Sequence, residues 1–390
     1  MSHSSPRRQM EHLLGRLIEF PTVSNRPVTE LGAFLAQHAE DLGFRVENFH
    51  SEPGKVNVVA TIGPERQGGL ALSGHMDVVP VAEKKWDTDP FSLTLREGRF
   101  YGRGTCDMKG FVAASMVALE SLDLSSLNRP LVLVWTHDEE VGCKGSENLV
   151  STFQQLGRVL PEVTWIGEPT DLRLCRMHPG HTTIQIRCVG KAAHSSRPEL
   201  GASAIRAAGW VLDALEAVER SFRQAPWAQA AGQTARGPMH PVMNVGRVTG
   251  GSAVNVVPAL CTIDVGIRQL PGQDGVKLFR YLESALVPVV SKALAHGVVV
   301  EVSLDGCTAS LLSPDGTSLI RHLAPQLDDS TETIVPFATD GGNLSALQTA
   351  PVVCGPGSIA QAHRENEFVE ADALVKTVGL VSEAIQSLCC

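Results

Sequence analysis

Two adjacent glutamates, Glu139 and Glu140, follow an apolar run at residues 131–136. A short apolar run of this kind predicts a fully buried strand. Two neighbouring carboxylates at the end of a strand are costly unless a cation lies close to both of them. One of them can bind a metal while the other acts as a general acid or base. A solvated acidic loop is the alternative interpretation of the pair.

His75 and Asp77 follow another apolar run, at residues 70–72. A spacing of two along a strand places both side chains on one face. A metal-bound imidazole usually donates its other N–H group to a carboxylate, so Asp77 could orient His75. Taken alone, His75 is better explained as an ordinary polar residue at the end of a strand.

Asp107 lies in a glycine-rich turn, with Gly102, Gly104 and Gly110 around it. Glycines allow unusual backbone angles and a close approach of other groups. The turn is not a nucleotide-binding fingerprint, because Asp107 stands where the third glycine of that motif would fall. A tight turn in which Asp107 caps the next helix is the alternative.

Glu168 and His363 complete the set of candidate metal ligands. Glu168 follows the apolar run at residues 163–166, and His363 lies in a loop rich in glycine and proline after another predicted strand. Each of them, taken singly, is an ordinary loop residue.

Two histidines and three carboxylates are more ligands than one zinc ion takes, since zinc binds about four. Two zinc ions that share Asp107 as a bridge would use the set well. Such a pair can lower the pKa of a shared water and leave Glu139 free to accept its proton. The remaining ligands would then divide into two pairs, His75 with Glu168 and Glu140 with His363.

The order of the predicted elements indicates how these residues are positioned. Strands alternate with helices up to about residue 178, which predicts a largely parallel or mixed sheet between helix layers, with ligands beyond the carboxyl ends of the strands. From residue 179 the order becomes β-α-β-β-α-β, the split ferredoxin-like unit. We therefore expect an α/β fold, with a three-layer catalytic domain at residues 1–178 and 308–390 and an inserted α+β domain at residues 179–307. The stretch 222–241 is expected to be a loop.

Length and composition agree with a two-domain globular protein. The chain has 390 residues, more than one core usually holds. It carries 33 basic and 42 acidic residues, a net charge of −9 without a basic block, so we expect no nucleic-acid partner. No apolar run is long enough for a membrane span, and residues 1–10 lack the apolar core of a signal peptide.

The nine cysteines form no CxxC pair. This pattern indicates reduced and mostly buried thiols in a cytoplasmic protein. The last two, Cys389 and Cys390, are expected to form an exposed tail.

Over nearly its whole length the chain resembles the M20 family of co-catalytic zinc peptidases and deacylases. Among the branches of that family it most resembles the acetylornithine deacetylases. Residues 339–342, Thr339-Asp340-Gly341-Gly342, depart from the acid–small–proline pattern of the best-known acetylornithine enzymes. The motifs that carry the resemblance are Gly74-His75-Met76-Asp77-Val78-Val79-Pro80, Gly104-Thr105-Cys106-Asp107-Met108-Lys109-Gly110, Asp138-Glu139-Glu140, Gly167-Glu168-Pro169-Thr170, Gly355-Pro356-Gly357-Ser358 and Gln361-Ala362-His363.

The resemblance implies roles that spacing alone does not give. It makes Asp107 the bridging ligand, Glu139 the base and Asp77 the residue that orients His75. It also implies a homodimer formed through the inserted domain. His194, in segment 191–198, would then reach into the active site of the partner and stabilise an oxyanion. Taken alone, His194 is more simply a surface histidine.

Four further residues resemble substrate-binding positions of the family. Arg268 and Asn255 would hold a substrate carboxylate, since a planar guanidinium suits a carboxylate fork. An ion pair of Arg268 with an acid such as Asp264 is the alternative. Gly357 and Ser358 could place backbone donors near the substrate.

These observations lead to an expected function. The chain should be a zinc-dependent amidohydrolase with two Zn²⁺ per subunit, for which Co²⁺ is a possible substitute. Its expected substrate is an N-acyl amino acid, first of all N2-acetyl-L-ornithine, whose deacetylation belongs to arginine biosynthesis. A succinyl-diaminopimelate desuccinylase, an aminoacylase and a dipeptidase are the near alternatives. A non-catalytic binding protein on the same fold is the alternative from another class.

Overall fold

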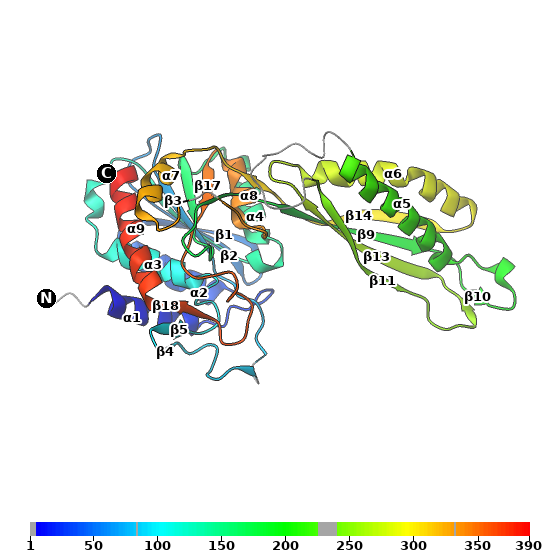
Figure 1. Cartoon of the computed structure of the whole chain (residues 1–390), viewed down its shortest axis with the longest axis horizontal. Coiled ribbons are helices and arrows are strands. Elements are labelled where there is room, and N and C mark those ends of the chain that lie inside the picture. Colours follow the sequence, from blue (N-terminus) through cyan, green and yellow to red (C-terminus); the bar gives the residue numbers. More distant parts are fainter. Residues whose placement is uncertain (1–4, 83–84, 225–239, 331–332) are drawn as a thin grey trace. The chain divides into compact units, whose positions relative to one another are not determined.

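The computed structural model describes residues 5–82, 85–224, 240–330 and 333–390 (Figure 1). The chain divides into two compact units. The large unit comprises residues 1–177, 311–335 and 339–390, and the inserted unit comprises residues 178–310 and 336–338. The expected boundaries, at 178/179 and 307/308, differ from these by one and three residues.

A nine-stranded mixed sheet forms the centre of the large unit, in the order β1-β2-β6-β3-β7-β17-β8-β15 with β16 beside β8. A smaller sheet has the order β18-β5-β4, and its β4–β5 hairpin turns at Glu97-Gly98. The strands of the large unit are β1 (Arg45–Glu52), β2 (Lys55–Ile62), β3 (Leu70–His75), β4 (Thr94–Arg96), β5 (Arg99–Tyr101), β6 (Leu131–Thr136), β7 (Val163–Ile166), β8 (Cys175–His178), β15 (Leu311–Leu312), β16 (Thr333–Ile334), β17 (Ala350–Val353) and β18 (Phe368–Glu370).

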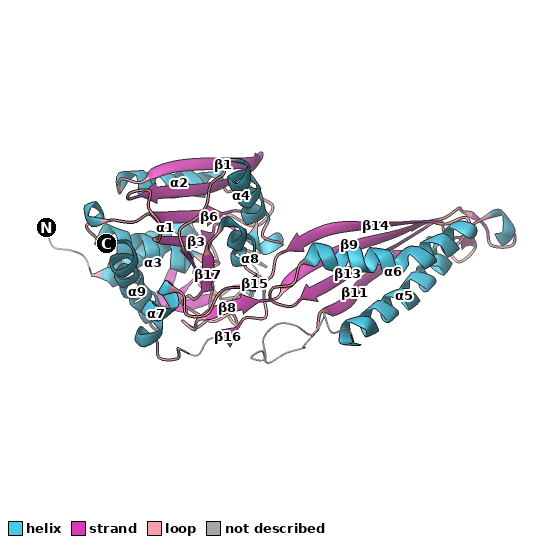
Figure 2. Ribbon diagram, turned by 90° about the horizontal axis from the view of Figure 1, so that it is seen from above, coloured by secondary structure: helices cyan, strands magenta, loops and turns pink. Residues whose placement is uncertain are grey.

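Helices cover both faces of the large sheet (Figure 2). Helices α1, α3 and α9 pack together on one face, and α4 and α8 pack together on the other. This arrangement confirms the expected three-layer α/β domain. The helices of the large unit are α1 (Pro6–Ile18), α2 (Thr29–Asp41), α3 (Lys109–Glu120), α4 (Lys144–Gln155), α7 (Ser318–Leu323), α8 (Asp340–Leu344) and α9 (Ala371–Cys389).

The central strands are continuous apolar runs because helices cover them on both sides. Every residue of β3, β6 and β7 is buried. Strand β3 pairs in parallel with both β6 and β7, and β17 pairs in parallel with β7. Four neighbouring strands therefore end at the same edge of the sheet.

The inserted unit has the expected ferredoxin-like order. Its four-stranded antiparallel sheet runs β11-β13-β9-β14, and helices α5 and α6 pack on it. A short ribbon, β10 with β12, adjoins this sheet. The elements are β9 (Gly180–Val189), β10 (Ala193–His194), α5 (Ala204–Gln224), β11 (Val242–Gly250), β12 (Val256–Val257), β13 (Leu260–Gln269), α6 (Gly275–Ala295) and β14 (Val299–Thr308).

Two local expectations need correction. The predicted loop at 222–241 begins later than expected, because Phe222 is fully buried on the apolar face of α5, which continues to Gln224. The rest of that stretch, 225–239, lies outside the described residues. Cys389 is not part of an exposed tail: it is fully buried as the last residue of α9, and only Cys390 is exposed.

All nine cysteines are free thiols, and seven of them are buried, as the sequence indicated. None of the helices in the described ranges is both long and apolar enough to cross a membrane.

Candidate metal and catalytic site

Five of the candidate residues lie at or beyond the carboxyl ends of the four parallel strands. His75 is the last residue of β3, and Glu168 follows β7 by two residues. Glu139 and Glu140 open a short 3-10 helix, Glu139–Val141, just after β6. The fifth candidate, His363, lies in the loop that follows β17. Convergence at one sheet edge is the position expected for a ligand site in an α/β fold.

Asp107 faces two histidines from the loop between β5 and α3. Its Oδ1 lies 3.0 Å from His75 Nε2, and its Oδ2 lies 3.3 Å from His363 Nε2. His363 Nε2 also lies 2.8 Å from Glu140 Oε2, and His75 Nε2 lies 3.7 Å from Glu168 Oε1. The structure therefore brings all five candidate ligands together, with one oxygen of Asp107 directed at each histidine.

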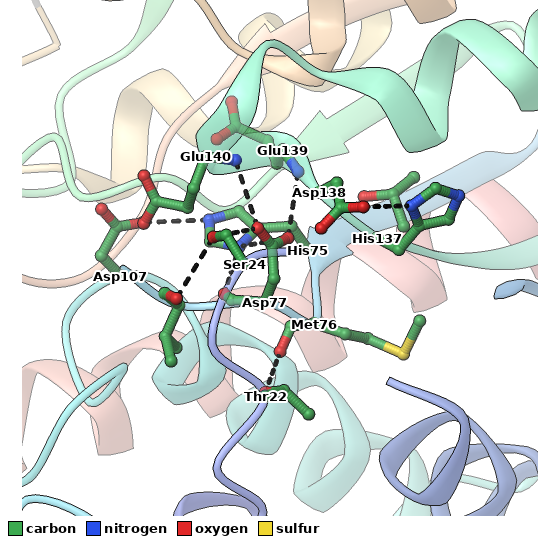
Figure 3. Close-up of polar contacts among 12 residues, drawn as sticks. Thr22, Ser24, His75, Met76, Asp77, Asp107, His137, Asp138, Glu139 and Glu140 are labelled. Atoms are coloured by element: carbon green, nitrogen blue, oxygen red, sulfur yellow. Dashed lines mark hydrogen bonds and ion pairs between the residues drawn. The ribbon is translucent and has the colours of Figure 1, made fainter. Parts of the chain in front are cut away.

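Asp77 holds the turn that presents the two glutamates (Figure 3). Its carboxylate accepts hydrogen bonds from the backbone N–H groups of Glu139 (3.0 Å) and Glu140 (3.3 Å) and from the Ser24 hydroxyl (2.8 Å). The close partner of His75 Nδ1 is the backbone oxygen of Asp77, at 2.8 Å, whereas the Asp77 carboxylate is 3.7 Å away. Asp77 thus holds His75 with its backbone oxygen rather than with its carboxylate. Strand β3 ends at His75, so the strand geometry that would place both side chains on one face does not extend to Asp77.

A second set of contacts fixes the same turn from the side of β2. Asp138 has a left-handed backbone, with φ of 50°. Its Oδ1 accepts hydrogen bonds from Lys55 Nζ at 2.7 Å and from the backbone N–H of Asn25 at 3.0 Å. Burial would raise the pKa of Asp138, but a hydrogen bond with His137 Nδ1 at 3.2 Å and the contacts with Lys55 and Asn25 hold it well below its usual range. Asp138 therefore remains charged and anchors the residue that precedes Glu139.

The electrostatics of the site show an excess of negative charge. Burial and neighbouring carboxylates raise the pKa values of Glu139 and Glu168 well above the ordinary value, and they raise that of Glu140 to about 7. Hydrogen bonds to Asp107 and Glu140 raise the pKa of His363 to about 10. Burial alone would lower the pKa of His75, but Asp107 and Glu168 raise it. The cluster therefore stabilises any positive charge placed among its members.

The donor set fits divalent metal ions. Donor atoms of His75, Asp107 and Glu140 lie within 4.8 Å of one another, and so do those of His75, Glu139 and Glu168. Oε1 of Glu140 is buried without a hydrogen-bond partner in the described structure, so it is available as a ligand. Imidazole and carboxylate together suit zinc and related transition metals.

Glu367 is a functional candidate that sequence reasoning missed. It is fully buried, and Arg103 Nη1 lies 2.5 Å from its Oε2. Its carboxylate also accepts the backbone N–H groups of Gly104 (3.0 Å), Cys106 (2.8 Å) and Asp107 (3.0 Å). Glu367 thereby shapes the loop that presents Asp107. Its only signal in the sequence is an acidic residue four positions after His363.

Comparison with known proteins identifies the family. Residues 71–387 match the model of peptidase family M20/M25/M40. The chain belongs to this family. It is 36% identical over 372 residues to an acetylornithine deacetylase of Pasteurella multocida (strain Pm70), covering 94% of this chain and 92% of that protein. It is 34% identical over 357 residues to an acetylornithine deacetylase of Proteus mirabilis (strain HI4320), and the match covers 91% of this chain and 89% of that protein.

Solved structures of M20 proteins share the fold. An M20 family metallo-carboxypeptidase from Sulfolobus solfataricus superposes with a TM-score of 0.73 at 18% identity, covering 99% of each chain. A Bacillus subtilis protein described as a dinuclear metal binding peptidase from the M20 family gives 0.66 at 15% identity, covering 98% of this chain and 99% of that one. The chain is thus a metal-dependent amide hydrolase of the M20 family.

Two of the expected substrate-binding residues of this M20 chain lie beside the candidate metal ligands. Ser358 forms an isolated bridge with Thr170, two residues after Glu168. The backbone oxygen of Gly357 accepts the N–H of Asp171 at 2.7 Å, and that of Ser358 accepts the Cys106 thiol at 3.4 Å. These contacts tie both residues to the segments that carry Glu168 and Asp107.

The other two, Asn255 and Arg268, lie in the inserted unit together with His194, at two ends of its sheet. His194 is exposed and pairs with Val256 in the β10–β12 ribbon. Asn255 lies beside it, because the backbone oxygen of Asn255 accepts the N–H of Ser195 at 2.9 Å. This ribbon follows the end of β9 that pairs with Leu260. Arg268 pairs with His181 at the opposite end. Arg268 lies eight positions after Leu260 on β13, which corresponds to about 27 Å of extended strand.

The alternative role considered for Arg268 is not observed. Asp264 pairs with Arg247 at 2.6 Å rather than with Arg268. Across the described residues Arg268 makes no ion pair, and the residue is exposed. It remains available to a ligand carboxylate.

Proposed function

We propose that this M20 hydrolase removes an acyl group from the α-nitrogen of an amino acid, with N2-acetyl-L-ornithine as its substrate. The observation that carries the proposal is the placement of Asp107 between His75 and His363, beside an uncommitted glutamate, Glu139. The acetylornithine assignment is supported by the similarity to two acetylornithine deacetylases over more than nine-tenths of the chain. The reaction would serve arginine biosynthesis in the cytoplasm.

The proposed site binds two zinc ions, or cobalt as a substitute. His75 and Glu168 would hold one ion, Glu140 and His363 the other, and Asp107 both. When bound, the ions would polarise the amide carbonyl and lower the pKa of a shared water.

Glu139 acts as the proton carrier in the proposed mechanism. It accepts the proton of the attacking water and later donates it to the departing amine. Asp77 fixes the turn on which Glu139 lies through the backbone N–H of Glu139.

The substrate carboxylate and the oxyanion require residues of the inserted unit. Arg268 and Asn255 would bind the carboxylate, and His194 would stabilise the oxyanion. Arg268 cannot join Asn255 and His194 of its own chain on one small substrate, because they lie at opposite ends of the sheet. We therefore propose a homodimer in which Asn255 of the partner subunit and His194 of the partner subunit complete each site. The exposed position of the ribbon supports this arrangement.

A substrate panel tests the specificity. Steady-state kcat/KM should be highest for Nα-acetyl-L-ornithine among acetyl amino acids, succinyl-diaminopimelate and dipeptides. A higher value for one of the others would transfer the assignment to a desuccinylase, aminoacylase or dipeptidase. Bound metal without turnover on any of them would favour a binding protein on the same fold.

A further inference from the structure

A second group of metal-binding atoms adjoins Glu139 and adds two residues, Cys143 and Asp340, that are not among the five ligands assigned above. The Cys143 thiol lies 3.3 Å from Glu139 Oε1 and donates a hydrogen bond to it. Donor atoms of Glu139, Cys143 and Asp340 all lie within 4.8 Å of one another. They come from three segments: the 3-10 helix after β6, the residue before α4 and the first residue of α8. The proposed mechanism uses neither Cys143 nor Asp340.

Asp340 supplies an independent indication that this group takes a ligand. Its side chain is only 2% exposed. The Thr136 hydroxyl donates to Oδ2 at 2.5 Å, whereas Oδ1 has no hydrogen-bond partner within the described part of the chain. No lysine or arginine of that part forms an ion pair with Asp340 or Glu139. A buried carboxylate oxygen without a partner is costly, and a cation would remove the cost.

The donor types select the kind of ion. A thiolate with two carboxylates suits zinc or the softer cadmium, whereas magnesium and calcium prefer oxygen ligands alone. On binding, the Cys143 S–H bond breaks, a metal–sulfur bond forms and the proton passes to the buffer. Each donor offers one atom, and water would complete the coordination.

We propose that Glu139, Cys143 and Asp340 form a third cation site, which takes zinc or cadmium in excess of the two catalytic equivalents and withdraws Glu139 from catalysis. The site would make the enzyme sensitive to an excess of the metal that it needs. The inhibitory effect rests on the proposed role of Glu139 as the base, but cation binding does not.

The test combines a spectroscopic and a kinetic measurement on the full-length protein carrying two equivalents of zinc. Cadmium is added stepwise, and the ultraviolet charge-transfer band of a cadmium–thiolate bond is recorded. The five ligands of the main site include no sulfur, so exchange of cadmium into that site gives no such band. The band should appear in the wild type and be lost in Cys143→Ser. The exposed thiol is removed in the control Cys390→Ser, which should keep the band.

Zinc inhibition is measured on the same proteins, each relative to its own rate at two equivalents. The zinc concentration for half-inhibition should rise at least about tenfold in Cys143→Ser and in Asp340→Asn, since each loses one ligand. The Asp340 variant provides a second test should the cysteine variant fold poorly. A band that persists without Cys143, or inhibition unchanged in both variants, would overturn the proposal. A Cys143-dependent band without inhibition would confirm the cation site and count against Glu139 as the base.

Discussion

Glu367 Oε1 accepts the backbone N–H of Asp107 at 3.0 Å, although 260 positions separate the two residues in the chain. The same oxygen accepts the N–H of Cys106, and Oε2 accepts that of Gly104. Glu367 thus sets the conformation of the loop that presents Asp107, the proposed bridging ligand. Glu367 is not itself one of the proposed metal ligands. Residues of this kind orient metal ligands.

Glu367→Gln should weaken metal binding by roughly 10- to 100-fold, because it loses one charged acceptor of the Asp107 loop. Competition with a chelator measures this affinity directly. Glu370→Gln, three residues on and exposed on β18, is the matched control and should bind metal normally. Wild-type affinity in Glu367→Gln would show that the loop keeps its conformation without this carboxylate.

Glu139→Gln should lower kcat by about 10²- to 10⁴-fold, the usual contribution of a general base. Metal content should be unchanged, because the proposed ligands are intact. Glu147→Gln, an exposed change on α4, is the control and should keep full activity. A Glu139→Gln enzyme that turns over at the wild-type rate would remove Glu139 from the mechanism.

The two-chain site predicts a pattern of complementation between inactive variants. Arg268→Ala mixed with His194→Ala should regain activity, because each mixed dimer contains one site with an intact Arg268 and an intact His194 of the partner subunit. His194→Ala mixed with Asn255→Ala should regain none, because both residues come from the same partner chain. Subunit exchange is verified with differently tagged chains. The reverse pattern would contradict the proposed division of the site.

Removal of the metal should destabilise the protein more at about pH 8 than at about pH 6. In the metal-free fold the pKa of Glu140 is raised from 4.5 to about 7 and that of His363 from 6.5 to about 10. The folded chain therefore holds more protons than the unfolded chain across this range, and its stability falls as pH rises. Metal binding needs deprotonated ligands and strengthens with pH.

The difference in Tm between loaded and chelated protein, measured at both pH values, tests this prediction. The difference should be larger at the higher pH. His363→Ala should reduce the pH dependence of the chelated protein, because it removes a proton that the fold retains up to about pH 10. A gap in Tm that narrows as pH rises would contradict the sign of these pKa shifts.

The architecture, and the meeting of the candidate ligands at one edge of the sheet, could be predicted from the sequence. Buried apolar runs made β3, β6 and β7 recognisable, and strand–helix alternation made them parallel, so His75, Glu140 and Glu168 had to meet at one edge. The β-α-β-β-α-β order of the inserted unit was equally clear, and the fold is confirmed.

Long-range contacts were beyond prediction from the sequence. Nothing in the spacing links Glu367 to the Asp107 loop, since no periodic pattern connects them. The main-chain contact of Asp77 with His75 was missed because it depends on where β3 ends, which sequence patterns locate poorly. The burial of Cys389 was missed for the same reason, because α9 continues to that residue. The distance between Arg268 and Asn255 became visible only with the register of β13.

A two-metal deacetylase must both bind two metal ions and depend on them for turnover. Metal content is determined by mass spectrometry, and amine release from Nα-acetyl-L-ornithine is followed with and without chelator. We expect about two zinc ions per chain and release that stops on chelation and returns with added zinc. A chain that binds no metal after reconstitution, or that releases the amine equally well with the metal removed, would contradict this expectation.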